Sequence, residues 1–189
     1  MKIKLAFCVL ALTPFAFVSE VNAQTKGMEG SYFGSTLDSN TTEGLLEFFE
    51  TNNSITPMDI FKMSTGEAEE KPSQLQGRFD FPTLPVSIRG TAYSSGEAKA
   101  IMPVISYDVG INNNTNIYAG AGYAFVKTNG EDTPLGDRDG LILTTGIEAK
   151  IVNNIVFFGD AKLMMDAESM RIRGTDAPVK LQFGIGYGF

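Results

Sequence analysis

The sequence predicts an all-β protein, an eight-stranded antiparallel transmembrane up-and-down β-barrel. Three observations favour this fold. Apolar residues recur at every second position from Leu75 onward, most of the alternating segments run for about ten residues, and long and short connections follow one another in turn. Strands of water-soluble proteins are usually shorter, at ~5–6 residues, whereas a tilted transmembrane strand needs ~9–11.

The clearest strand is segment 140–151, in which apolar residues hold most odd positions and polar or small residues the even ones, with Ile142 as an exception. Such alternation places one kind of residue on each face of a strand. The facing of the first segment is ambiguous, because Tyr32 and Phe33 are adjacent aromatic residues. The eight predicted strands are 29–37, 75–82, 84–94, 100–111, 116–127, 140–151, 155–164 and 179–189.

The connections between these strands predict which edge of the barrel faces outward. Segments 38–74, 127–139 and 165–178 are long, whereas those near residues 82, 113 and 153 are tight. In transmembrane barrels the long loops lie outside and the short turns lie in the periplasm. Two alternatives stay open for 38–74. It could contain a short amphipathic helix after Asn40, or a further strand pair around 57–63 that would give ten strands.

The N-terminus has the pattern of a cleaved signal peptide. Lys2 and Lys4 precede an apolar segment, 5–18, which is too short for the ~20 residues of a spanning helix. Small residues lead up to Ala23, so we expect cleavage between Ala23 and Gln24. The domain organisation predicted is a signal peptide, 1–23, followed by one barrel domain, 24–189.

The composition of the mature chain disfavours several classes of function. It has 13 Lys and Arg (15 less two) and 21 Asp and Glu (22 less Glu20), a net charge of −8 that does not suit nucleic acid. It has no histidine, the usual general base near neutral pH, and the single cysteine, Cys8, lies in the signal peptide. We therefore expect no enzyme, no catalytic residues, no metal site and no cofactor.

Charged residues on the polar faces of the strands indicate a charge-paired interior. An Arg or Lys side chain would cost ~2–4 kcal/mol on a lipid-facing surface at the membrane midplane, but inside a narrow barrel the charges can pair with one another. Aromatic residues near the turn edge, such as Phe79 and Phe157, would form an interfacial girdle. The predicted interior charges are Arg78, Asp80, Arg89, Asp108, Glu148, Lys150, Asp160, Lys162 and Lys180.

Two segments carry a resemblance to a known family. Segment 179–189 resembles the closing strand of outer-membrane barrels, and the glycine-rich segment 118–123 is similar to a strand of the outer-membrane β-barrel domain family, which includes small porin-like, opacity-like and OmpA-transmembrane-like proteins. The resemblance implies an outer-membrane location and an assembly signal at Phe183, Tyr187 and Phe189. The implied partners are the barrel-assembly machinery, periplasmic chaperones in transit, outer-membrane lipid and lipopolysaccharide, and we expect a monomer.

The function favoured by the sequence is a structural or surface-interaction role in the outer membrane. The interior of an eight-stranded barrel is just wide enough for side chains to fill, so paired charges there would block bulk flow. Two alternatives remain. One is a narrow porin for small solutes, and the other is a secreted lipocalin-like barrel that binds an apolar ligand, in which the facing of the strands would be reversed.

Overall fold

The fold is described by a computed structural model, which covers residues 27–37, 56, 58, 73–128, 138–152, 154–165 and 179–189. The predicted signal peptide and its cleavage site at Ala23 and Gln24 lie outside the described residues, as do most of the three long connections. No helix among the described residues is long and apolar enough to cross a membrane.

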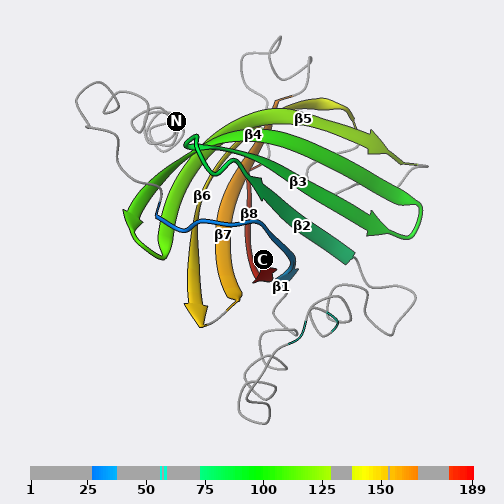
Figure 1. The fold of residues 1–189 in the computed structure, drawn as a ribbon. Helices are drawn as coiled ribbons and strands as arrows, with labels where there is room; N and C mark the ends of the chain where they lie inside the picture. The colour runs from blue at the N-terminus through cyan, green and yellow to red at the C-terminus, as the bar shows by residue number, and fades with distance from the viewer. Residues whose placement is uncertain are drawn as a thin grey trace.

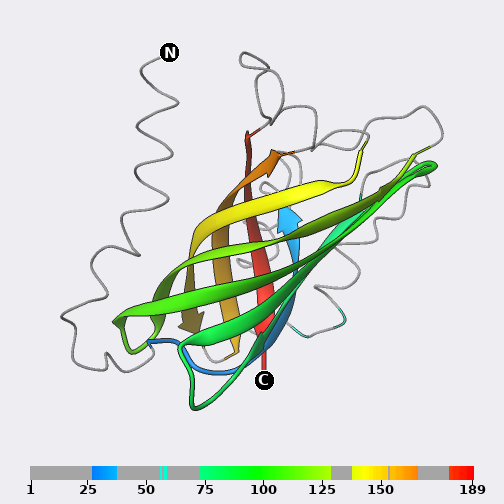
Figure 2. The ribbon, with the colours of Figure 1, turned by 90° about the horizontal axis from the view of Figure 1, so that it is seen from above.

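Eight antiparallel strands form a closed barrel in chain order, and β1 pairs with β8 to complete it (Figure 1). Seen at right angles in Figure 2, the strands are strongly tilted and the β3–β4 hairpin extends past its neighbours. The strands are β1 (Tyr32–Leu37), β2 (Ser73–Asp80), β3 (Val86–Ser95), β4 (Ala98–Asn112), β5 (Thr115–Lys127), β6 (Gly140–Val152), β7 (Ile155–Met165) and β8 (Val179–Gly188).

The eight-stranded fold predicted from the sequence is confirmed, with corrections at strand ends. β2 ends before Pro82 and β3 begins after Pro85, whereas the alternation predicted that both strands reach further into this turn. Proline has no N–H to donate to a strand ladder, which favours a turn here. The ten-stranded alternative is wrong, because β1 pairs directly with β2 and leaves no place for strands between them.

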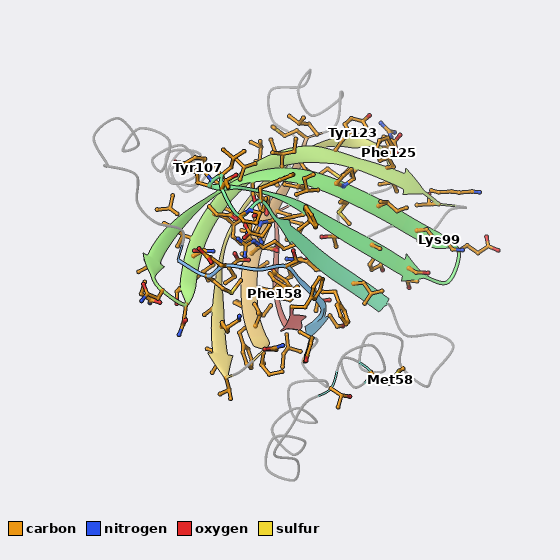
Figure 3. All side chains as sticks on the ribbon, viewed as in Figure 1. Met58, Lys99, Tyr107, Tyr123, Phe125 and Phe158 are labelled. Carbon is orange, nitrogen blue, oxygen red and sulfur yellow. The ribbon has the colours of Figure 1, made fainter. Side chains whose placement is uncertain are left out.

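In β1, the side chain of Tyr32 points into the barrel and that of Phe33 points outward. Tyr32 is 1% exposed and lies opposite Arg78 of β2 and Gly188 of β8. Its ring stacks on that of Phe158, 5.6 Å away. Figure 3 labels Phe158, which is buried in the barrel interior. Phe33 instead lies 6.4 Å from the ring of Phe189. The pairing of β1 with both neighbours therefore resolves the facing that its sequence left open.

The barrel has an apolar outside and a largely polar inside. Ile105 and Leu181 are 64% and 66% exposed, whereas Glu148 is fully buried. A water-soluble barrel buries its apolar faces, so the lipocalin-like alternative is wrong. Exposed apolar surface of this extent, on strands of this length, is the arrangement of a transmembrane barrel.

Close contacts between glycines and aromatic rings allow the narrow interior to be filled. Gly184 of β8 lies directly opposite Phe158 of β7. A Cβ atom at position 184 would overlap the Phe158 ring, well inside van der Waals contact. Glycine is therefore needed there because the ring of Phe158 covers the backbone of the next strand.

Candidate functional site

The barrel interior is the candidate site, and two arginines form its centre. Arg78 of β2 and Arg89 of β3 lie directly opposite each other, so their like charges need shared counterions. Asp108 supplies one: its two carboxylate oxygens lie 2.9 Å from Arg78 Nη2 and 3.0 Å from Arg89 Nη2. Glu148 supplies the other, 3.2 Å from Arg78 Nη1 and 2.8 Å from Arg89 Nη1.

Further polar groups complete the bonding of these arginines. Arg78 also pairs with Asp80 at 3.1 Å and donates from Nε to the Ser87 hydroxyl, and Arg89 Nε donates to the Ser106 hydroxyl. The Arg89 guanidinium lies 3.4 Å from the centre of the Tyr118 ring. Buried charges are tolerated where they are paired and hydrogen-bonded, and this layer meets both conditions.

A second polar group in the interior is built from side chains of β2, β5, β7 and β8. Lys162 Nζ is 2.7 Å from Asp160 Oδ1, and Tyr118 donates to Asp160 Oδ2. Lys180 has a neutral partner, since its Nζ donates to Gln74 Oε1 at 3.0 Å. Two other glutamine amides, those of Gln76 and Gln182, also donate to Asp160.

The structure brings together most of the charges that the sequence predicted to lie inside. Seven of the nine are buried, and Lys180 is half-buried on the same inward face. Lys150 is half-buried at the turn edge, and the structure records no ion pair for it with an acid of the described residues. The sequence analysis missed the uncharged partners, although their inward parity could have identified them: Gln74, Gln76, Ser87, Ser106, Asn116, Tyr118 and Gln182.

An apolar cluster lies on the inner face of strands β3 to β7. It is near the edge of the barrel that carries the long connections. Ile142, an exception in the sequence pattern, is fully buried within it. The inward parity of these residues in the sequence could have revealed the cluster. Its members are Tyr93, Ala98, Ala100, Met102, Val104, Ala124, Ile142 and Met164.

The turn-side end of the interior is crossed by residues 27–31, which we call the N-terminal strap (blue in Figure 1). Met28 is 2% exposed, and its backbone exchanges two hydrogen bonds with the Asn116 side chain, at 3.0 and 2.9 Å. Arg78 donates to the Gly30 carbonyl at 3.1 Å, and the Gly30 N–H donates to Asp80. Gly30 has φ of +97°, a conformation that few other residues adopt. The strap is thus bonded directly to the charged layer.

The residues predicted as an assembly signal lie on the outer face of β8 and just beyond its end. Phe183 and Phe189 are 65% and 73% exposed, and Tyr187 accepts a hydrogen bond from the Asn154 amide. The backbone of Phe189 also pairs with Ser31, through bonds of 2.9 and 3.2 Å. Near the same turn edge, the rings of Phe79 and Phe81 meet edge to face at 5.5 Å.

The chemistry of the interior is that of ion pairing. The carboxylates of Asp108, Glu148 and Asp160 each contact a cation. Among the residues that the structure describes, no group of three or more histidine, cysteine, aspartate or glutamate side chains could hold a metal ion.

Comparisons with known proteins give a weak structural likeness and no match in sequence. No protein-family model matches the chain, and no curated protein matches its sequence. Among solved structures it is similar to the outer membrane protein Ail of Yersinia pestis in a phospholipid bilayer nanodisc. The identity is 12% and the TM-score 0.45, over 85% of this chain and 100% of that one. The strand pairing and the facing of the side chains themselves establish the architecture: the chain is a closed eight-stranded antiparallel β-barrel with an apolar outward face, the arrangement of a transmembrane barrel.

Proposed function

We propose that this protein is a closed outer-membrane barrel with a structural or surface-interaction role. The observation that carries the proposal is the filled interior. The N-terminal strap, the arginine layer and the apolar cluster follow one another from the turn edge to the long-connection edge.

Each layer opposes a continuous path for water by a different means. At the strap, water would have to replace two hydrogen bonds between Met28 and Asn116. In the arginine layer it would have to separate charges that share Asp108 and Glu148. Past the apolar cluster it would find few hydrogen-bond partners. An eight-stranded barrel has little interior width to spare, and these layers occupy it.

The long connections are then the places where the protein meets its partners. Binding residues concentrate on loops that a rigid scaffold holds in position. Shortening segment 38–72 should leave the barrel heat-modifiable on gels, because β1 and β2 on either side of it pair directly with each other. The same deletion should change surface binding or sensitivity to serum or phage. Loss of folding after this deletion would count against the assignment of the segment to a surface connection.

Export to the outer membrane is part of the proposal. N-terminal sequencing of the protein extracted from membranes should begin at Gln24. A mature protein that retains segment 5–18 would contradict this route.

Planar-bilayer recording tests the closed interior directly. The refolded wild-type protein should give little or no steady current, while a diffusion porin inserted in the same bilayer serves as positive control. Large, stable and reproducible conductance would overturn the proposal in favour of the narrow-porin alternative.

A further inference from the structure

Hydrogen bonds between neighbouring hairpins run around the turn edge of the barrel. Each tight turn at this edge gives a backbone carbonyl to an N–H of the strand that follows its hairpin, at 2.6 to 2.9 Å. The remaining side of this ring, between β8 and β2, is the place of β1 and of the residues before it. The pairs of carbonyl and N–H are Pro85 with Asp108, Asn114 with Lys150, and Asn154 with Gly188.

The N-terminal strap supplies the link on that remaining side. Ser31 exchanges two backbone hydrogen bonds with Phe189, just beyond β8, and its hydroxyl accepts one from the Asp80 N–H of β2 at 3.2 Å. β1 and β8 are the first and last strands, so their pairing closes the barrel without a turn between them. Figure 2 shows the strap, in blue, at the same edge as the C-terminus. The strap therefore joins β8 to β2 where the barrel is closed by hydrogen bonds alone.

The turn-side mouth holds the strap by one side chain and by its backbone. The side chain of Met28 is buried in a cluster with Tyr32 of β1 and with Val156 and Phe158 of β7. The Asn116 side chain of β5 accepts from the Met28 N–H and donates to the Met28 carbonyl. An amide that satisfies both groups of one residue fixes an extended backbone in place, and the buried methionine adds apolar contact.

Glycine at position 27 is part of the same fit. A Cβ atom there would overlap the carbonyl oxygens of Asn112 and Thr115, at the two ends of the β4–β5 turn. A side chain at this position would push the strap away from the mouth. Glu29, in contrast, is exposed, so its side chain contributes little to the docking.

The contacts of the strap require a barrel that is already closed. Met28 and Asn116 are 88 residues apart, and Ser31 pairs with the last residue of the chain. Contacts between such distant segments form only after β5, β7 and β8 are in place, because each closes a long loop at a cost in entropy. Interactions that form after the folding transition state slow unfolding and leave the folding rate almost unchanged.

We propose that the turn-side mouth is a docking site for the N-terminal strap, which enters it after the barrel has closed and then limits the rate at which the barrel opens. Release of the strap uncovers Met28 and Asn116 and removes the link between β8 and β2. The strap thus acts as a lock on the β1–β8 pairing, in addition to filling the end of the interior.

Folding and unfolding rates of strap variants test the lock. The mature chain is refolded into phosphatidylcholine vesicles and unfolded in urea, and gel mobility without heating follows both reactions. Met28→Ala should raise the unfolding rate about 10- to 100-fold and change the folding rate by less than about twofold. Gly27→Ala, which blocks docking without altering a strand, should act in the same direction. The matched control Glu29→Ala should leave both rates unchanged.

A thiol at position 28 reports the order of events. The chain from Gln24 onward has no cysteine, so Met28→Cys and Glu29→Cys each carry a single thiol. When maleimide is added in pulses during refolding, position 28 should stay reactive until after the folded band has formed on gels and should then become protected. Position 29 should stay reactive throughout.

Two results would overturn the proposal. One is an unfolding rate of Met28→Ala and Gly27→Ala equal to that of the control, or a fall in their folding rates as large as the rise in unfolding. The other is protection of position 28 before the folded band appears or together with it. Neither measurement depends on whether the barrel conducts.

Discussion

Glu148 is one of the two anions that both interior arginines share, so its replacement by glutamine should destabilise the folded barrel. Its carboxylate lies 3.2 Å from Arg78 Nη1 and 2.8 Å from Arg89 Nη1, and it also accepts a hydrogen bond from the Asn116 amide at 3.1 Å. The Glu148→Gln substitution keeps the shape and one acceptor oxygen but removes the negative charge.

The size of the effect follows from what the arginines retain. Removing one member of a buried ion pair costs ~3–5 kcal/mol. Arg89 keeps Asp108, and Arg78 keeps both Asp80 and Asp108, so the lower end of that range applies. We expect a loss of about 3 kcal/mol in the free energy of unfolding, which is roughly a hundredfold in the folding equilibrium.

Urea titration of the protein refolded in lipid vesicles, followed by gel mobility without heating, measures this loss. The control is Glu29→Gln, which removes the same charge from an exposed side chain and should change stability by no more than about 0.5 kcal/mol. A loss below about 1 kcal/mol for Glu148→Gln, similar to that of the control, would refute the argument that shared anions stabilise the arginine layer.

Three further predictions concern packing, the strap and assembly. Gly184→Ala should cost about 1–3 kcal/mol, because the added methyl group overlaps a ring of β7, whereas Gly90→Ala, with nothing within 4 Å, should be neutral or stabilising; urea titration compares them. Asn116→Ala should speed hydrogen exchange of the Met28 amide about 10- to 100-fold, since it removes that amide's buried acceptor, and unchanged exchange would mean that the strap is held otherwise. Phe189→Ala should reduce the amount of folded protein in the outer membrane while leaving precursor processing intact, and insertion equal to wild type, measured by gel mobility of membrane fractions, would contradict the predicted assembly signal.

The sequence predicted the strands well because the two faces of a barrel strand differ in polarity, which gives a period of two along the strand. In β6, most odd positions are apolar and most even positions are polar or small, with Ile142 as an exception. The inward face that contains Glu148 follows from the cost of placing its charge in lipid. β1 lacked this contrast, since Tyr32 and Phe33 are both aromatic. Its facing is determined by pairing with β2 and β8, which are distant in sequence.

The sequence predicts which charged residues of the candidate site face inward, but it does not predict which of them form ion pairs with one another. Parity determines which face a residue occupies, whereas the height and tilt of each strand determine which charges meet. Arg78 and Glu148 come together from β2 and β6, while Lys180 meets an amide of β2. Residues 29–31 of the N-terminal strap were predicted as the start of the first strand, but β1 begins at Tyr32. The strap could not be predicted because its bonds to Asn116 depend on the closed barrel.

The facing of the strands toward lipid can be measured most directly with single tryptophans, since the chain contains none. Ile105→Trp, Ile147→Trp and Leu181→Trp place the probe at exposed positions of β4, β6 and β8. In vesicles containing brominated lipid, the fluorescence of all three should be strongly quenched, and Glu29→Trp, at the turn-side end, should be quenched less. Weak quenching at the three strand positions, equal to that at position 29, would contradict the transmembrane arrangement.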